Sequence, residues 1–187
     1  MTGPPVPGPA PVSGPALVVV GPPASGKTTV GTAVAAALGL PFRDTDADVE
    51  AQTGTTIADL FTSRGEPFFR ELEEQAVARA LAEHPGVLAL GGGAVTSAAT
   101  RALLVAYGSA GGAVLWLDVD VTSAAERAGL SRDRPLLAVD PRAVLRTMLE
   151  ARAPLYAEVA TRTVPTSARP VADVLADVLA ALPEGAR

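Results

Sequence analysis

Apolar runs of strand length alternate with helical patterns from about residue 16 to the end of the chain. The runs that predict strands are 16–20, 42–46, 87–90, 113–118 and 162–164. The helical patterns between and after them cover 29–38, 47–52, 55–61, 66–83, 97–107, 122–128, 141–160 and 170–182. Because strands and helices alternate, we expect an α/β fold with a parallel sheet covered by helices on both faces. Proline lacks the N–H of a helical hydrogen bond, so Pro154 is expected to interrupt the last long helix but one.

The composition predicts one domain with an aliphatic core. Hydrophobic residues make up 48% of the 187 residues, but aromatic residues only 4%. No apolar run reaches the roughly 20 residues of a membrane span, and no signal peptide is recognisable, so we expect a cytoplasmic protein without a membrane partner. The absence of cysteine excludes disulfides and thiolate metal sites, and a single histidine argues against a histidine-based zinc site. A net charge of −5 argues against nucleic acid as a partner.

The first 15 residues differ from the rest of the chain because they are rich in proline and glycine. Such a segment cannot form a helix or the interior of a sheet, so we expect a disordered tail over 1–15 and a single domain over 16–187. No sustained heptad pattern is present, which favours a monomer.

The candidate chemistry begins with a glycine-bounded loop, Gly21-Pro22-Pro23-Ala24-Ser25-Gly26-Lys27-Thr28. It matches G-x-x-x-x-G-K-[ST] and joins the first predicted strand to the first predicted helix, which is the context of a nucleoside triphosphate site. Backbone N–H groups of such a loop and the start of the helix converge on phosphate. Lys27 is expected to reach the β- and γ-phosphates, and the Thr28 hydroxyl is expected to bind Mg²⁺.

Three further features are expected at the same edge of the sheet, where a phosphate acceptor must bind. Asp44 and Asp46 end the second predicted strand, and two carboxylates separated by one residue on an extended chain point the same way. They suit hydrated Mg²⁺ or a substrate hydroxyl. Arg70, early in the helix over 66–83, indicates either an anionic ligand or an ion pair with neighbouring acids. The glycines at 91–93 indicate either a close backbone approach or N–H groups that face a ligand.

Together these elements resemble shikimate kinase. The resemblance rests on the phosphate loop, the triplet at 44–46, Phe69-Arg70 with Glu73, and Leu90-Gly91-Gly92-Gly93. It continues through Arg134-Pro135-Leu136-Leu137 and Arg152-Ala153-Pro154-Leu155-Tyr156, and it covers nearly all of 17–182. It implies a three-layer α/β/α P-loop kinase fold with a central five-stranded parallel sheet of order 2-3-1-4-5. It also implies an acceptor segment at about 44–73 and a mobile lid at about 129–139.

The resemblance implies that ATP donates its γ-phosphoryl to the 3-hydroxyl of shikimate, with Mg²⁺ as cofactor, in aromatic amino acid biosynthesis. The catalytic residues implied are Lys27, Asp46 and Arg134. Those implied for the acceptor are Asp46, Arg70, Gly91, Gly92, Gly93 and Arg152, with Glu73 as structural support for Arg70. Those implied for ATP are Ala24, Ser25, Gly26, Lys27, Thr28, Thr29, Arg127, Arg134 and Arg169. The metal would be held by Thr28 and Asp44.

Several residues of this chain have simpler interpretations. Ala24 occupies a position where many members of the family carry glycine, and we expect it to avoid left-handed backbone angles. Asp48 is expected to be a solvated residue at a helix start, His84 an exposed residue at a helix end, and Trp116 a core residue. Arg132 is expected to be a plain surface charge.

Two other functions remain open from the sequence. One is a P-loop kinase for another polyol acid such as gluconate, because both arginines would bind any carboxylate. The other is a nucleotide-binding regulatory protein without catalysis, which the presence of Lys27, Thr28 and both aspartates disfavours.

Overall fold

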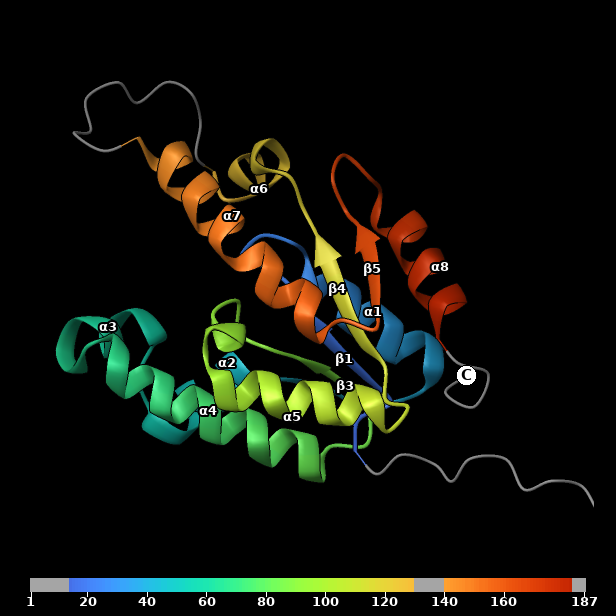
Figure 1. Ribbon diagram of the computed structural model, residues 1–187, viewed down its shortest axis with the longest axis horizontal. Coiled ribbons are helices and arrows are strands. Elements are labelled where there is room, and N and C mark those ends of the chain that lie inside the picture. The colour runs from blue at the N-terminus through green and yellow to red at the C-terminus, as the bar shows by residue number, and fades with distance from the viewer. Residues whose placement is uncertain (1–13, 130–139, 183–187) are drawn as a thin grey trace, which may run out of the picture.

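The computed structural model describes residues 14–129 and 140–182, and its centre is a parallel sheet of five strands (Figure 1). The strand order is β2-β3-β1-β4-β5, and every neighbouring pair is parallel. The strands are β1 (Leu17–Val20), β2 (Phe42–Asp44), β3 (Val87–Ala89), β4 (Val114–Asp118) and β5 (Arg162–Pro165). This confirms the expected α/β fold and the strand order implied by the resemblance.

The helices occur between the strands as the alternation predicted. They are α1 (Lys27–Leu38), α2 (Thr45–Thr53), α3 (Ile57–Arg64), α4 (Glu66–Glu83), α5 (Ala98–Ser109), α6 (Val121–Arg127), α7 (Pro141–Val159) and α8 (Val171–Ala181), with a 3₁₀ turn, η1, at Ala94–Thr96.

The two faces of the sheet form separate hydrophobic clusters. Successive residues of β1 point to opposite faces: Val19 packs in the cluster with α1 and α8, whereas Val18 and Val20 pack in the cluster with α4, α5 and α7. All four residues of β1 are buried. A central parallel strand covered on both faces therefore reads as a continuous apolar run rather than an alternating one.

A third cluster holds the segment α2–α3–α4, which forms a lobe beside the sheet (Figure 1). Its buried residues are Val49, Leu60, Phe69, Leu72 and Ala76. Thr56 caps α3 by accepting a hydrogen bond from the N–H of Asp59. The cluster fixes the start of α4 relative to the end of β2, and both contribute to the site described below.

Two expectations about element boundaries are wrong. The strand β2 ends at Asp44, because the Asp44 side chain accepts the N–H of Asp46 at 3.0 Å and starts α2 as an N-cap. The helix α7 continues through Pro154. Both Pro154 and Glu150, whose carbonyl loses its usual N–H partner, are exposed, so water can replace the missing donor.

The expectation for His84 is also wrong, because its side chain is buried. Only 8% of the residue is exposed, and Nε2 lies 3.1 Å from the carbonyl oxygen of Val87. The turn that follows is packed tightly: a Cβ at Gly86 would lie 2.0 Å from the carbonyl oxygen of Pro41. His84 is therefore enclosed between the end of α4 and the start of β3.

Four predictions lie partly or wholly outside the described residues. Two are segments: the tail at 1–15, apart from its last two residues, and the lid at 129–139, apart from its first. The other two are the role of Arg134 and the surface position of Arg132. Within the described ranges, no helix is both long and apolar enough to span a membrane.

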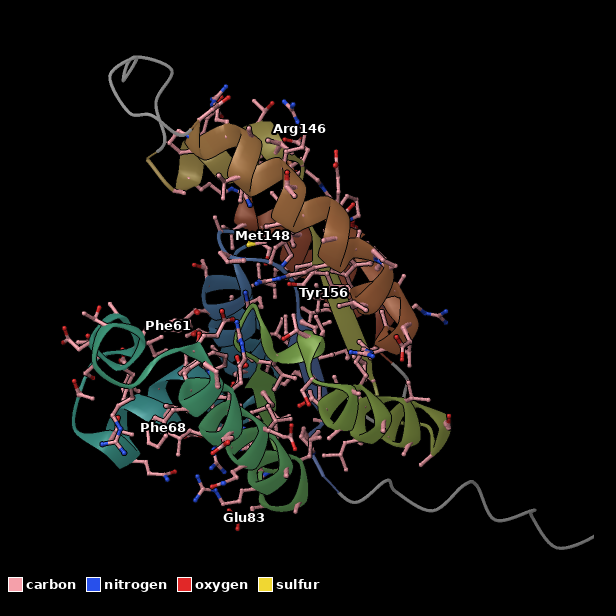
Figure 2. The ribbon with its side chains drawn as sticks, turned by 60° about the vertical axis from the view of Figure 1, so that its left-hand side comes forward. Phe61, Phe68, Glu83, Arg146, Met148 and Tyr156 are labelled. Carbon is pink, nitrogen blue, oxygen red and sulfur yellow. The ribbon has the colours of Figure 1, made fainter. Side chains whose placement is uncertain are left out.

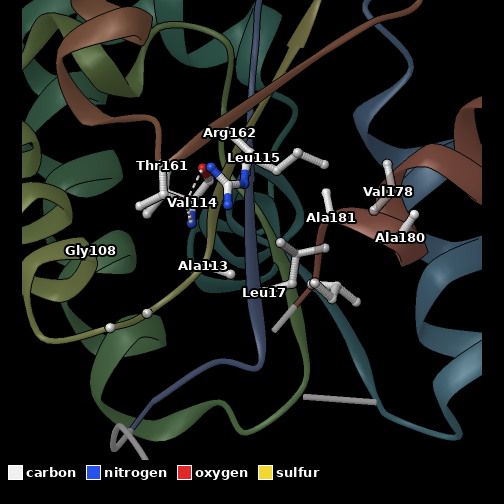
Figure 3. A pocket seen from close by; sticks show the side chains of 13 residues that line it. Leu17, Gly108, Ala113, Val114, Leu115, Thr161, Arg162, Val178, Ala180 and Ala181 are labelled. Atoms are coloured by element: carbon white, nitrogen blue, oxygen red, sulfur yellow. Dashed lines mark hydrogen bonds between the residues drawn. The ribbon is translucent and has the colours of Figure 1, made fainter. Parts of the chain in front are cut away.

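A pocket of about 540 Å³ opens at the amino ends of β1, β4 and β5 (Figure 3). Leu17, Val114 and Arg162, each at or near the start of its strand, are among the residues that line it. The phosphate loop follows the carboxyl end of β1, so this pocket lies at the opposite edge of the sheet from that loop.

Candidate functional site

The phosphate loop joins β1 to α1 at the carboxyl edge of the sheet. Gly21 and Gly26 have φ angles of 153° and 93°, which side-chain-bearing residues rarely adopt. A Cβ at Gly21 would also lie 2.7 Å from the carbonyl oxygen of Leu117. Gly26 is the N-cap of α1, so the helix starts at Lys27 with its free N–H groups directed at the loop.

Ala24 in this loop is left-handed, contrary to our expectation, with a φ of 63°. Its carbonyl oxygen accepts a hydrogen bond from Arg127 Nη1 at 3.2 Å. The loop therefore imposes a backbone conformation that costs an alanine about 1–2 kcal/mol.

Replacing Ala24 with glycine is expected to stabilise the protein by about 0.5–1 kcal/mol. Glycine removes the left-handed strain, while its freer unfolded chain offsets part of the gain. Urea unfolding measures the difference, and Ala78→Gly, at an exposed position inside α4, serves as the matched control. That control should lose about 1 kcal/mol. A loss of stability in Ala24→Gly would show that the left-handed angle is not a source of strain.

Lys27 lies at the centre of the site and is the only lysine in the sequence. Its Nζ donates a hydrogen bond to the carbonyl oxygen of Pro22 at 2.9 Å. Burial lowers the pKa of Lys27 to about 8, and the nearby carboxylates of Asp46 and Asp44 oppose that shift. Lys27 is therefore mainly protonated at neutral pH and faces both aspartates.

Thr28 and Asp44 come together as the motif predicted. Thr28 Oγ1 donates a hydrogen bond to Asp44 Oδ2 at 3.1 Å, while Asp44 Oδ1 caps α2. Hydroxyl and carboxylate oxygens are the donors that Mg²⁺ prefers. The described residues contain no group of three or more histidine, cysteine, aspartate or glutamate side chains that could hold a metal. An ion here would therefore need oxygens from a ligand or from water as well.

Asp46 lies in the first turn of α2, close to two other acids. Its pKa is raised to about 6, mainly by burial and then by the negative charges of Asp44 and Glu73, while Lys27 opposes the shift. Glu73, from α4, is 2% exposed, and burial raises its pKa although Arg70 acts in the opposite direction. A Cβ at Gly91 would lie 2.4 Å from both Asp46 Oδ1 and Glu73 Oε1. The carboxylates of Asp46 and Glu73 therefore pack directly against the backbone of Gly91.

Arg70 is held by two acids of its own helix. It pairs with Glu66 at 2.8 Å and with Glu73 at 2.6 Å, so the expected ion pairs are present and Glu73 supports Arg70. These pairs do not exclude an anionic ligand. A Cβ at Gly93 would lie 2.0 Å from Arg70 Nη1. The guanidinium can occupy this position only because residue 93 has no side chain.

The triglycine segment 91–93 forms a shared floor between α4 and α7. The Gly91 N–H donates to Thr45 Oγ1 at 3.0 Å, and Arg152 Nη1 from α7 donates to the Gly92 carbonyl oxygen at 3.1 Å. None of the three glycines has a positive φ. Close approach, and not backbone angle, is therefore the reason for glycine at these positions.

The phosphate loop also borders a smaller pocket of about 190 Å³. Of the residues implied for ATP, it is lined by Ser25, Gly26, Thr29, Arg127 and Arg169. Arg127 donates to Thr166 Oγ1 at 3.1 Å and to the Thr166 carbonyl oxygen at 2.5 Å. Arg169 pairs with Asp177 at 2.7 Å. The structure thus places both arginines beside the loop, separate from the pair Arg70 and Arg152.

Besides Ala24 and His84, sequence reasoning misjudged Asp48, and it gave no role to three other residues. Asp48 is not simply solvated, because it pairs with Arg43 at 2.7 Å. Thr45 and Thr166 are buried and hold Gly91 and Arg127 in place, and Tyr156 reaches Gly92. The sequence signals among these were the position of Thr45 between two acids of the triplet and the position of Tyr156 at the end of the motif that begins at Arg152.

Comparison with known proteins agrees with this geometry. The family model described as "Shikimate kinase" matches residues 23–183. The chain is 54% identical to the shikimate kinase of Frankia casuarinae over 165 residues, which cover 88% of this chain and 71% of that protein. It is 52% identical to the shikimate kinase of Salinispora arenicola over 168 residues, covering 90% and 98% of the two chains. A solved structure, the shikimate kinase from Acinetobacter baumannii in complex with shikimate, has a TM-score of 0.78 at 37% identity and covers 89% of this chain and 91% of its own. The chain belongs to the shikimate kinase family.

Proposed function

We propose that this protein transfers the γ-phosphoryl group of ATP to the 3-hydroxyl of shikimate, giving shikimate 3-phosphate and ADP. One observation carries the proposal: Arg70 and Arg152 reach the triglycine floor from two different helices, beside Asp46 and the phosphate-loop lysine. The site thus combines cations for a carboxylate, an acid for a hydroxyl and a loop for phosphate. The Acinetobacter baumannii relative, which is similar over most of both chains, holds shikimate.

The acceptor would bind through its carboxylate and its hydroxyls. Arg70 and Arg152 present planar guanidinium groups that suit a carboxylate better than lysine does. The pairing of Arg70 with Glu66 and Glu73 fixes its orientation before the acceptor arrives. Asp46 would accept a hydrogen bond from the reacting hydroxyl and orient it.

The N–H groups of Gly92 and Gly93 support this assignment. Among the described residues, neither N–H has a hydrogen-bond partner, although residue 93 is buried. A buried N–H without a partner is costly, so an oxygen of the acceptor would complete the site.

The donor would bind on the other side of the phosphate loop. Residues 24–29 would hold its phosphates, and Arg127 and Arg169 would lie near the adenine. Thr28 and Asp44 fit Mg²⁺ by their chemistry and their contact. When bound, Mg²⁺ would offset charge on the phosphate oxygens.

The chemical step would need little covalent help from the protein. Phosphoryl transfer passes through a loose transition state, so positioning and charge stabilisation dominate. Lys27 would stabilise charge on the transferred group, and Arg134 would add a second cation from the predicted lid. Asp46, with a pKa of about 6, would be ionised at neutral pH and could accept the proton of the hydroxyl.

The direct test is ADP release by the purified protein with Mg²⁺-ATP and shikimate, gluconate or no acceptor. Stimulation by shikimate alone would support the proposal. Stimulation by gluconate alone would agree with the proposed phosphate site and refute shikimate as the acceptor. If neither acts while ATP still binds, the regulatory alternative replaces the enzyme.

Replacing Arg152 with alanine is expected to raise the KM for shikimate by about 10- to 100-fold, the range of a lost charge-assisted hydrogen bond. The KM for ATP should change by no more than about twofold, because Arg152 contacts the triglycine floor and not the pocket beside Arg127. Arg146→Ala is the matched control, since Arg146 lies exposed on the same helix (Figure 2). Equal rises in both KM values would contradict the clamp role.

A further inference from the structure

The carbonyl oxygen of Gly92 accepts two hydrogen bonds from α7. The Tyr156 hydroxyl donates at 2.6 Å and Arg152 Nη1 donates at 3.1 Å. Tyr156 and Arg152 are four residues apart and therefore share one face of the helix. The Gly92 carbonyl oxygen thus binds both the neutral hydroxyl of Tyr156 and the charged guanidinium of Arg152.

Tyr156 itself is firmly held. It is 1% exposed, and its ring stacks on Trp116 of β4 with centroids 5.8 Å apart and an interplanar angle of 24°. In Figure 2 its side chain points from α7 toward the centre of the molecule. Burial raises the pKa of the Tyr156 hydroxyl to about 12, with Arg152 opposing the shift, so the group stays protonated and remains a donor.

The bond to Gly92 has a directional consequence. The carbonyl of Gly92 and the N–H of Gly93 belong to one planar peptide unit and point in opposite directions. Fixing the carbonyl toward α7 therefore fixes the Gly93 N–H away from α7. That N–H is one of the two without a partner among the described residues.

Gly92 also lies close to the phosphate loop. A Cβ at Gly92 would lie 2.8 Å from Pro23 Cδ in the phosphate loop. The hydrogen bonds that hold Gly92 in place therefore also limit how far the triglycine floor can move relative to the phosphate loop.

We propose that Tyr156 is a positioning residue of the acceptor site: through the Gly92 carbonyl it fixes both the Arg152 guanidinium and the Gly93 N–H for the acceptor. This inference rests on the proposed function. It extends that function by assigning a task to a buried hydroxyl that would not touch the acceptor itself.

The test compares Tyr156→Phe with the matched variant Tyr107→Phe. Both remove one hydroxyl that donates to a backbone carbonyl, but Tyr107 bonds to Pro15, which precedes β1 at the other end of the sheet. We expect Tyr156→Phe to raise the KM for shikimate about five- to tenfold, with the KM for ATP within about twofold of wild type. Tyr107→Phe should leave both KM values unchanged even if it unfolds at lower urea concentration.

A second measurement reads binding without turnover. Trp116 is the only tryptophan in the sequence, and it stacks on Tyr156, so its fluorescence should respond when shikimate is titrated. The Kd for shikimate should rise by the same factor in Tyr156→Phe and not in Tyr107→Phe. Isothermal titration calorimetry replaces fluorescence if the phenylalanine ring changes the signal of Trp116.

A double-mutant comparison separates positioning from general loss of packing. If Tyr156 acts through Arg152, adding Tyr156→Phe to Arg152→Ala should raise the KM for shikimate by less than it does in the wild-type background. Equal shikimate affinity in Tyr156→Phe and Tyr107→Phe would overturn the proposal. A wild-type protein that neither binds nor phosphorylates shikimate would overturn the proposed function, and the Tyr156 proposal with it.

Discussion

Replacing Lys27 with alanine is expected to lower kcat by about 10³-fold, the effect of removing a cation or donor that stabilises transition-state charge. Lys27 starts α1, touches the phosphate loop through Pro22 and faces the carboxylates of Asp46 and Asp44. No other lysine in the sequence could take its place. The KM for ATP should also rise, because the lysine contributes to binding as well as to the chemical step.

Steady-state ADP release measures both effects, and Ala24→Gly provides a control within the same loop. That variant changes the loop backbone but keeps the cation, so its kcat should remain within severalfold of wild type. Lys27→Ala with nearly normal kcat would refute the phosphate-loop assignment. A fall in Lys27→Ala alone would show that the charge, and not the loop conformation, is required.

Replacing Asp46 with asparagine is expected to have two opposite effects. The kcat should fall by about 10²–10⁴-fold, because asparagine orients the hydroxyl poorly and cannot accept its proton. The free energy of unfolding of the metal-free protein should nevertheless rise by about 2 kcal/mol at pH 8. The buried charge of Asp46 is therefore expected to support catalysis while it lowers the free energy of unfolding.

The sign of the stability effect follows from the direction of the pKa shift. The pKa of Asp46 is raised to about 6 in the folded protein, above its ordinary value, mainly by burial. The ionised carboxylate therefore destabilises the fold above that pH, and the penalty disappears as the pH falls from about 6 to about 4. Asparagine carries no charge, so its advantage should be full at pH 8 and absent near pH 4.

Urea unfolding at several pH values measures this difference, with Asp48→Asn as the matched control. Asp48 lies in the same first turn of α2 but pairs with Arg43 at 2.7 Å. Its replacement should lose a little stability at pH 8 and keep kcat. If Asp46→Asn unfolds at the same urea concentration as wild type at pH 8 and at pH 4, the ionised Asp46 carboxylate does not destabilise the fold.

The fold was predictable because its signals are local and repeated. The apolar strands and the glycine-bounded loop predicted the elements around the site, and the resemblance supplied the strand order that the structure confirms. Lys27 and Thr28 could be placed because the loop motif is contiguous in sequence. Arg70 and Glu73 could be paired because they lie one helical turn apart.

The remaining details depend on contacts between distant segments. The left-handed angle of Ala24 accompanies a hydrogen bond from Arg127, 103 residues later. The burial of His84 depends on how the turn before β3 packs on Pro41. The strand ends after Asp44 because the Asp44 side chain caps α2, so Thr45 and Asp46 are helical and not extended. The pattern of hydrophobic and polar residues along the chain does not predict these contacts.

The isolated amine at the phosphate loop also has a practical consequence for anyone who labels this protein. With a pKa of about 8, Lys27 is partly deprotonated and nucleophilic under mildly alkaline coupling conditions. Because no other lysine side chain is available, activated esters have only Lys27 and the chain's α-amino group as amine targets. Amine coupling to a dye, a bead or a sensor surface would therefore modify the phosphate loop or the amino terminus, and ATP bound at the proposed site should protect Lys27 and leave the amino terminus as the target.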